Sequence, residues 1–284
     1  MIQVSKLEGR LARALITLPF LLLWSGELVY GSERYIVLAS TTSTVNSGLF
    51  DIILPEFTKK TGISIRVVGV GTGQAIKIAQ RGDADVLFVH HKKSELNFVE
   101  EGFGVKRYDV MYNDFVLVGP NSDPAGIRNA NSAVAAYRKI AVTKSLFVSR
   151  GDDSGTHKKS LEIWRQASVE VNGISGQWYR EVGSGMGATL NISQAMNGYT
   201  ISDRSTWEAF KNKGSVKLLF EGGATMRNQY GIVMVNPSIH KHVKAPLASA
   251  FINWVLSNDG QSTINDFRVN GKQVFFANAR SGGE

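Results

Sequence analysis

Helix-like and strand-like segments alternate along residues 35–89, and this alternation constrains the fold more than any other feature of the sequence. Two stretches, 48–61 and 74–80, carry apolar residues at helical spacing, and Gly62 follows the first in the position of a C-cap glycine. Because strands and helices in this order form βαβ units, we expect a parallel sheet covered by helices. The expected strands are three runs rich in β-branched and apolar residues: 35–39, 63–70 and 85–89.

A second set of elements follows the apolar strand at 115–118, which we expect to cross between two lobes. A strand at 230–235 returns the chain, and a helix over 247–256 is expected to pack on the first lobe. The predicted fold class is therefore α/β, with two Rossmann-like α/β lobes joined by a two-stranded hinge that lets the cleft close. Between the crossings we expect strands near Phe147, Tyr199 and Val216 and helices near Leu161 and Trp207.

The first thirty residues differ in character from the rest of the chain. Basic residues precede an apolar run of 11 residues, Ala14 to Trp24, and a polar break then leads to Gly31. This pattern is typical of a secretory signal peptide cleaved near Gly31, and the run is shorter than the roughly 20 residues that a bilayer span needs. The predicted organisation is a signal peptide at 1–31, lobe I at 32–114 with 226–284, and lobe II at 115–225.

The composition narrows the class of protein. The 284 residues are 43% hydrophobic, and they include no cysteine for disulfides or for an N-terminal lipid. The formal net charge of +8 suits a binder of nucleic acid, of anionic membranes or of small anions. Because the chain is expected to be exported and its basic residues are scattered, we expect a freely diffusing periplasmic monomer that binds a small anion and no nucleic acid.

Three segments rich in hydroxyl groups or glycine are expected at the carboxyl ends of strands, where open α/β sheets bind ligands. The helix that follows such a segment presents free backbone N–H groups, which favour an anion. Because a buried dianion needs donors for every oxygen, donors from two lobes would couple binding to closure. The segments are the hydroxyl loop Thr41-Thr42-Ser43, the glycine loop Gly71-Thr72-Gly73 and the arginine loop Arg150-Gly151-Asp152-Asp153-Ser154-Gly155-Thr156.

The hydroxyl loop and the glycine loop each have a simpler interpretation. Threonine and serine commonly cap helices, and a Gly-Thr-Gly segment commonly forms a turn. Gln74 stands where a dinucleotide-binding fingerprint needs its third glycine, so that motif is incomplete. Either loop alone therefore predicts a cap or a turn rather than a binding site.

The arginine loop is more specific, because a helix cap does not need an arginine, an acid and Ser-Gly-Thr together. Arg150 can donate to two oxygens of an anion, and Ser154, Gly155 and Thr156 are the further candidate donors. A free carboxylate in this loop would repel a fully ionised anion but accept a hydrogen bond from a protonated one. We expect Asp152 to hold the guanidinium through a charge-assisted pair, although the choice between the two acids stays open.

Other conspicuous residues are expected to be structural. The run His90-His91-Lys92-Lys93 lies after a strand and could border the cleft, but a solvated charged loop is the simpler interpretation. No set of histidines has metal-ligand spacing, so we expect neither a metal nor a cofactor. Thr189 is expected at a helix start. The tryptophans expected in the core are Trp164, Trp178 and Trp207.

In order along the chain, a set of short motifs resembles those of the tungstate-specific substrate-binding proteins of ABC transporters. They cover nearly all of the sequence after the signal peptide, and Ser160 is a small departure where an acid would be expected. The motifs are Leu38-Ala-Ser-Thr-Thr-Ser-Thr44, Asn46-Ser-Gly-Leu49, Val70-Gly-Thr-Gly73, Gly82-Asp-Ala-Asp85, Asp109-Val-Met-Tyr-Asn-Asp-Phe115, Phe147-Val-Ser-Arg-Gly-Asp-Asp-Ser-Gly-Thr-His-Lys-Lys159, Gly185-Met-Gly-Ala-Thr-Leu-Asn191 and Thr200-Ile-Ser-Asp-Arg204.

This resemblance implies a periplasmic-binding-protein type II fold, a tungstate ligand bound as an oxyanion, and delivery to a membrane permease with its ATPase. The oxyanion donors that it implies are Thr41, Thr42, Ser43, Thr72, Arg150, Ser154 and Thr156.

Several alternatives stay open. The Arg-x-Asp-x-Ser-Gly-Thr pattern is also similar to that of phosphate-binding proteins, and molybdate has nearly the size, shape and charge of tungstate. A secreted serine hydrolase would use Ser154 with His157, but the Gly-x-Ser-x-Gly elbow is missing. A ligand sensor for signalling would have the same site.

Overall fold

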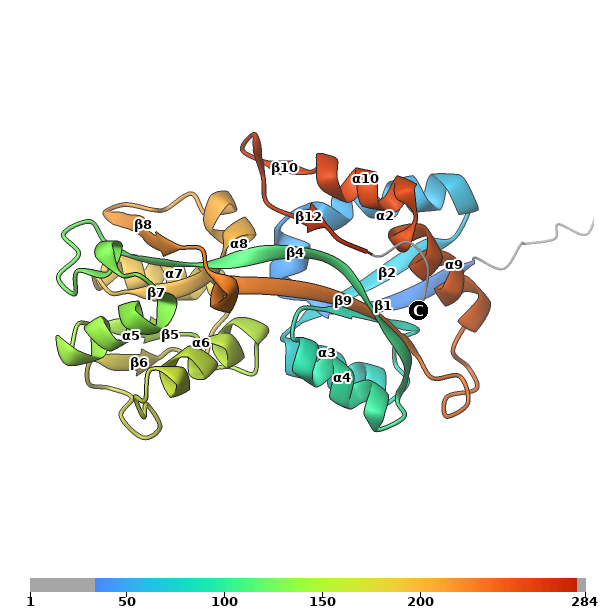
Figure 1. Cartoon of the computed structure of the whole chain (residues 1–284). Coiled ribbons are helices and arrows are strands. Elements are labelled where there is room, and N and C mark those ends of the chain that lie inside the picture. The colour runs from blue at the N-terminus through green and yellow to red at the C-terminus, as the bar shows by residue number, and fades with distance from the viewer. Residues whose placement is uncertain (1–33, 280–284) are drawn as a thin grey trace, which may run out of the picture. The chain divides into compact units, whose positions relative to one another are not determined.

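The computed structural model describes residues 34–279, and the predicted signal peptide at 1–31 lies outside this range. Within the described range, no helix combines the length and the apolar character that a membrane span requires. Strands and helices are interleaved along the whole of this range, which confirms the predicted α/β class (Figure 1).

The main sheet is mixed rather than parallel. Its longest path, in spatial order, is β12 (Phe276–Ala277), β4 (Gly104–Pro120), β9 (Arg227–Val235), β3 (Val86–Val89), β1 (Tyr35–Thr41) and β2 (Ser64–Val70). β1 pairs in parallel with β2 and β3, as predicted, but β9 lies antiparallel between β3 and β4. The parallel arrangement predicted for the first three strands is therefore confirmed, and the sheet as a whole is mixed because its next strand comes from a distant segment that runs the other way.

β4 takes part in two sets of strands. Residues 104–114 pair with β9, whereas residues 115–120 pair with β7 (Thr200–Asp203) and β8 (Val216–Glu221). Figure 1 shows β4 and β9 running side by side between these sets. Two further strand pairs are separate from this sheet: β5 (Phe147–Ser149) with β6 (Tyr179–Glu181), and β10 (Arg268–Val269) with β11 (Lys272–Gln273).

Helices fill the connections, and their ends follow local sequence signals. Gly62 ends α2 in the left-handed region with a φ of 68°, as its C-cap position predicts. Thr41, Ser154 and Asp203 each accept an amide hydrogen from the helix that follows. The helices are α1 (Thr42–Asn46), α2 (Leu49–Thr61), α3 (Thr72–Gln80), α4 (Lys92–Glu100), η1 (Ile127–Asn129), α5 (Ala133–Val142), α6 (Gly155–Gln166), α7 (Met186–Ala195), α8 (Arg204–Ala209), η2 (Ala224–Met226), α9 (Ala245–Leu256) and α10 (Asn258–Asp266).

The buried apolar side chains fall into two groups along the chain. Two clusters draw on residues 36–111 and 230–275, and the other two draw on residues 115–226. We call the first group of residues region A and the second group region B. The limits of regions A and B lie close to the boundaries predicted for lobes I and II. That the two lobes move relative to each other remains a prediction.

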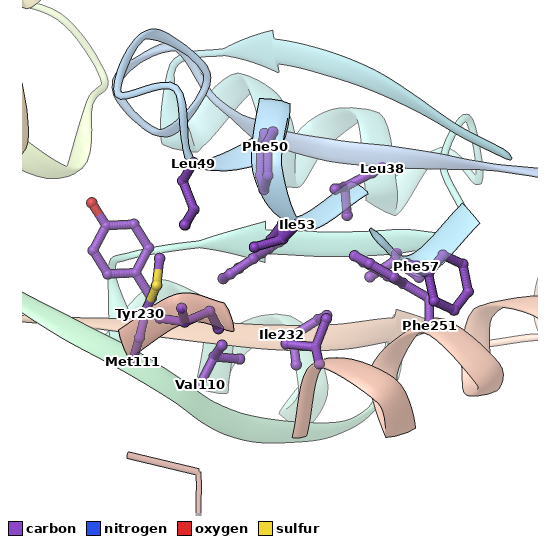
Figure 2. Close-up of a cluster of buried hydrophobic side chains, with 14 of the residues drawn as sticks. Leu38, Leu49, Phe50, Ile53, Phe57, Val110, Met111, Tyr230, Ile232 and Phe251 are labelled. Carbon is purple, nitrogen blue, oxygen red and sulfur yellow. The ribbon is translucent and has the colours of Figure 1, made fainter. Parts of the chain in front are cut away.

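The largest cluster of region A packs α2 and α9 against the sheet (Figure 2). Phe57 of α2 and Phe251 of α9 meet edge to face, with ring centroids 5.1 Å apart. The helix predicted at 247–256 therefore does pack on the first half of the fold. Tyr230 lies at the margin of the cluster, and its hydroxyl points away from the other labelled side chains.

Two polar segments differ from the predicted elements. The sequence predicts a loop at 40–44, but β1 continues to Thr41 and α1 begins directly after it. It also predicts a solvated loop at 90–93, but His90 is buried and α4 begins at Lys92. Both segments end buried strands, where polar side chains find buried partners instead of water. Of the tryptophans expected in the core, Trp164 and Trp207 are buried and Trp178 is half-buried.

Candidate functional site

The hydroxyl loop lies at the carboxyl end of β1, as the sequence predicts. Thr41 caps α1, and its Oγ1 accepts the amide hydrogen of Thr44 at 3.4 Å. Ser43 is buried, and its Oγ lies 3.2 Å from Nε2 of His90. Thr42 is exposed. The loop therefore combines two buried hydroxyl groups with one that faces solvent.

The glycine loop joins β2 to α3 and lies against the arginine loop. Gly71 caps α3 without a side-chain hydrogen bond, and Thr72, the first helical residue, is buried. Oγ1 of Thr72 accepts the amide hydrogen of Gly155 at 3.0 Å. The amide of Gly73 donates to the carbonyl of Asp153 at 3.0 Å. These two hydrogen bonds bring a loop of region A against a loop of region B.

Arg150 follows β5, and Asp152 holds its guanidinium in the way that the sequence predicts. Nε and Nη2 of Arg150 donate to Oδ2 of Asp152 at 3.1 and 2.6 Å. The other carboxylate oxygen, Oδ1, accepts the hydroxyl of Ser154 at 2.5 Å. Asp153 pairs instead with Lys158 at 2.8 Å, which decides between the two acids. Since Arg150 is only 7% exposed, solvent screens its charge weakly.

Thr156 carries a buried hydroxyl without a hydrogen-bond partner among residues 34–279. The residue is fully buried in the first turn of α6, which begins at Gly155. Leaving such a group unsatisfied costs about 1–3 kcal/mol, so a buried orphan in a native structure calls for an explanation such as a ligand or an ordered water. A spare donor at the start of a 12-residue helix is well suited to an anion oxygen.

His90 belongs to the site, which corrects the predicted solvated loop. Its Nδ1 lies 3.0 Å from Oδ1 of Asn228, and its ring stacks on Tyr230 with centroids 4.8 Å apart. Nδ2 of Asn228 donates in turn to Oδ1 of Asn113 at 2.7 Å. Burial lowers the pKa of His90 to about 4, although the charge of Asp203 and the hydrogen bond to Asn228 act in the opposite direction. The ring is therefore neutral near pH 7.

The two asparagines lie where the paired strands leave region A. Asn113 on β4 and Asn228 on β9 are register partners, and both are buried. In the chain they lie between the residues of regions A and B, so hydrogen bonds connect the hydroxyl loop to the strands that join the regions. Sequence reasoning missed this network. Little in the sequence signals it, because Asn113 is followed by Asp114 and Asn228 lies between Arg227 and Gln229, so these strand ends look solvated.

Two further hydroxyl groups considered from the sequence have local partners. The hydroxyl of Thr189 donates to the carbonyl of Gly185 at 3.0 Å, within the first turn of α7. Nδ1 of His157 lies 3.1 Å from Oγ of Ser149, whereas Oγ of Ser154 accepts the backbone amide of His157. The imidazole is thus bonded to Ser149 rather than to Ser154, and the nucleophile–base pair of a serine hydrolase is not formed.

The arrangement provides hydrogen-bond donors rather than metal ligands. It includes the first turns of α3 and α6, buried hydroxyl groups and one guanidinium, contributed by both regions. In residues 34–279, no three histidine or acidic side chains are grouped so that they could hold a metal ion. The two helix N-termini, the hydroxyl groups and a buried positive charge together favour a small anion.

Comparison with known proteins agrees with this architecture. A family model described as a PBP superfamily domain matches residues 28–259. The tungstate-binding protein TupA of Peptoclostridium acidaminophilum is 46% identical over 244 residues, which cover 85% of this chain and 83% of the relative. The tungstate-binding protein TupA from Desulfovibrio alaskensis G20 superposes with a TM-score of 0.77 at 42% identity, over 87% of this chain and 100% of that chain. The tungstate ABC transporter structure from Geobacter sulfurreducens gives a TM-score of 0.76 at 46% identity, over 83% and 99%.

The fold and the family match over most of the chain define a solute-binding protein of the PBP superfamily. Within that superfamily, the chain belongs to the family of the TupA proteins, as the identity over most of both chains shows. The resemblance carried by the short motifs is thereby confirmed.

Proposed function

We propose that this protein captures tungstate between regions A and B and delivers it to the membrane permease of an ABC transporter. The observation that carries the proposal is the buried, unpartnered hydroxyl of Thr156, which lies in the same loop as the buried guanidinium of Arg150. Relatives of the same fold named as tungstate-binding proteins support the choice of ligand.

The proposed ligand contacts come from both regions. The glycine loop and the arginine loop already touch through the hydrogen bonds of Thr72 and Gly73, so an anion held there would contact both regions. A ligand that binds the closed arrangement better than the open one shifts the protein toward closure, with β4 and β9 as the hinge. The proposed ligand-binding residues are Thr41, Thr42, Ser43, Thr72, Arg150, Ser154, Gly155 and Thr156.

A fully ionised oxyanion suits the arginine loop better than phosphate does. Near neutral pH, phosphate carries a proton that needs an acceptor, whereas tungstate carries none. Both oxygens of Asp152 already accept hydrogen bonds, from Arg150 and from Ser154, and Asp153 is paired with Lys158. The acids of the loop are therefore engaged, and an unmet hydrogen bond on a buried ligand is costly. Molybdate, which is also fully ionised, is the closer competitor.

The proposed location follows from the amino-terminal segment. A signal peptide cleaved near Gly31 would deliver the mature chain to the periplasm as a freely diffusing monomer. There it would exchange its cargo with the permease. The names of two relatives, an ABC transporter anion-binding protein and a tungstate ABC transporter, support this partner.

Calorimetric titration with tungstate, molybdate, sulfate and phosphate tests the proposal. We expect tungstate to bind tightly, molybdate to be the nearest rival, and sulfate and phosphate to bind far more weakly. The same ligand should raise the unfolding free energy, by about 4 kcal/mol at a thousandfold excess over Kd. Tight phosphate binding beside a flat response to tungstate would overturn the assignment.

The guanidinium is tested by replacing Arg150 with alanine. We expect Arg150→Ala to weaken tungstate binding by about 2–5 kcal/mol, because it removes one partner of a buried, hydrogen-bonded charge pair. Arg81→Ala is the matched control, since Arg81 is an exposed arginine of region A paired with Asp83. Equal affinities for the two variants would mean that Arg150 does not face the ligand.

A further inference from the structure

We infer that His90 is a positioning residue that sets the direction of the Ser43 hydroxyl, and that an oxyanion reverses the hydrogen-bond direction of the chain from Ser43 through His90 and Asn228 to Asn113. This inference deepens the proposed function and rests on it, because the ligand is the proposed oxyanion.

The direction of this hydrogen-bond series is set by its two amide groups. Nδ2 of Asn228 donates to Oδ1 of Asn113 at 2.7 Å, so the Oδ1 of Asn228 is the atom that faces His90. Because a carbonyl oxygen only accepts, Nδ1 of His90 carries the proton. The neutral ring then has an unprotonated Nε2, which accepts the Ser43 hydroxyl 3.2 Å away.

In this direction, Ser43 has no proton to give to an anion. Its hydroxyl hydrogen points to His90, and only oxygen lone pairs remain toward other neighbours. Oγ1 of Thr41 lies 3.1 Å from Ser43 Oγ and can satisfy one of these lone pairs. The hydroxyl that was expected to donate to the oxyanion is therefore turned toward the ring.

The same four side chains have a second consistent direction. If both amides rotate by half a turn, Asn113 donates to Asn228, and Asn228 donates to Nδ1 of His90. The ring then carries its proton on Nε2 and donates to Ser43, whose own hydrogen becomes free for the oxyanion. In the reversal Nε2 takes the Ser43 hydroxyl proton, Nδ1 releases its proton to water, and water returns a proton to Ser43, so each direction has one proton on the ring and one on the hydroxyl.

Two buried polar groups at or beside the asparagines have no hydrogen bond within residues 34–279, which favours a network whose hydrogen bonds can run in either direction. Nδ2 of Asn113 and the hydroxyl of Tyr230 are buried without a hydrogen bond of normal geometry among the described residues. Burial and the charge of Asp203 raise the pKa of Tyr230 well above the ordinary value, while its hydroxyl lies close enough to Thr44, Asn228 and Asn113 for these three side chains to lower it. Rotation of Asn113 uses its Nδ2 as a donor and turns its oxygen toward this hydroxyl.

The negative charge of the ligand favours one of the two hydrogen-bond directions over the other. His90 is buried and neutral, and the charged groups that act on it include Asp203, which raises its pKa, and Arg150, which lowers it. A dianion near Ser43 attracts a hydroxyl hydrogen and repels lone pairs, so it stabilises the reversed direction. Only this difference between the two directions can shift their balance.

The first experiment reads the ring tautomer directly by NMR. The protein is labelled with ¹⁵N-histidine, and the His90 signals are assigned as those lost in His90→Gln. If His90→Gln does not fold, the His90 signals are assigned by elimination from four single glutamine variants, at His91, His157, His240 and His242. Protonated and unprotonated ring nitrogens have well separated shifts. We expect the proton on Nδ1 without tungstate and on Nε2 with it.

The second experiment is a double-mutant cycle on tungstate affinity. Ser43→Ala should weaken binding about tenfold to a hundredfold, the range for a hydrogen bond to a charged group. His90→Leu should weaken it by a similar factor in the native background but by less than twofold in the Ser43→Ala background. His90→Gln, whose amide can donate to Ser43, should recover most of the affinity.

The outcomes separate this inference from the proposed function. If the native protein does not bind tungstate, both fail. If it binds tungstate but the proton stays on Nδ1, the reversal is wrong. If the effects of His90→Leu and Ser43→Ala are simply additive, His90 does not act through Ser43, and the positioning role is wrong.

Discussion

At the scale of single residues, the site is built from buried polar groups that are satisfied to different degrees. The guanidinium of Arg150 has a partner on one edge, and Ser154 is bonded to the same acid. Thr156 has no partner within the described residues. Side chains whose hydrogen bonds are all made within the protein are expected to support the site, whereas a side chain with an unmade hydrogen bond is a candidate to bind the ligand.

Replacing Thr156 with valine separates stability from binding. Valine has nearly the shape of threonine, so Thr156→Val removes an unsatisfied buried hydroxyl without making a cavity. We expect the unfolding free energy of the ligand-free protein to stay level or rise by about 1 kcal/mol, because the desolvation cost is removed. Tungstate affinity should fall at least tenfold. Urea unfolding and calorimetry measure the two quantities, and a loss of stability with unchanged affinity would show that the hydroxyl is structural.

Protonation of His90 is expected to destabilise the protein in acid. Its pKa in the folded state, about 4, lies below the ordinary value of 6.5. The unfolded chain therefore binds the proton more tightly, and stability falls as pH drops from 6.5 to 4, by roughly 3 kcal/mol in all. Urea unfolding at pH 7 and pH 4 should show a smaller loss for His90→Gln than for the native chain. Burial also lowers the pKa of His157, and its contribution is common to both proteins.

The sequence predicted the arginine loop better than it predicted the surroundings of the hydroxyl loop. The pairing of Arg150 with Asp152 is local, so residue types and spacing were enough to predict it. The contact of Ser43 with His90 joins residues 47 positions apart, and the role of Asn228 depends on a strand that arrives 138 positions after His90. Such partners depend on sheet topology, which periodicity does not reveal.

At the scale of elements, the beginnings of α3 and α6 lie against each other through the hydrogen bonds of Thr72 and Gly73. Gly155 is the first residue of α6, and a Cβ added there would lie 3.1 Å from the His90 ring and 3.2 Å from Thr72 Oγ1. Glycine therefore permits the approach of the arginine loop to region A. The helices expected at 48–61, 74–80 and 247–256 are present, whereas α4, α5 and α10 were not predicted from the sequence.

Gly155→Ala tests this close approach. The added methyl group overfills the space between the ring and Thr72, at a cost of about 1–3 kcal/mol in the closed arrangement, so tungstate affinity should fall about fivefold or more. Gly187→Ala is the control, since Gly187 lies in the first turn of α7 and an added Cβ there meets nothing within 4 Å. Calorimetry on both variants decides. Unchanged affinity in Gly155→Ala would argue against closure at this contact.

At the scale of the whole molecule, a few polar contacts besides the site loops join regions A and B. Nε2 of His91, at the start of α4, lies 3.4 Å from Oε1 of Glu162 on α6. Nζ of Lys272, in the hairpin of β10 and β11, lies 3.1 Å from both carboxylate oxygens of Glu208 on α8. At least one partner of each pair is partly exposed to solvent, so each pair adds little to the contact between the regions.

Glu162→Gln tests the contribution of the first pair. The hydrogen bond from His91 is the main cause that lowers the pKa of Glu162 to about 2, so the contact persists at neutral pH and is lost as pH falls from 4.5 toward 2. After allowance for solvent, the pair is worth about 0.2–1 kcal/mol, and affinity should fall no more than about fivefold. Glu100→Gln changes the same charge at an exposed position of α4 and should leave affinity unchanged. A larger fall in Glu162→Gln would show that closure depends on this pair.

The position of β9 between β3 and β4 affects the order in which the sheet can form as the chain is synthesised. β3 and β4 are both finished by residue 120, yet the strand that lies between them spans residues 227–235. Region B is contiguous in sequence and can therefore gather its core while β3 still has an open hydrogen-bonding edge. Until β9 emerges, that edge invites pairing with other chains. Region A, most of which is translated first, is thus the region whose sheet is completed last.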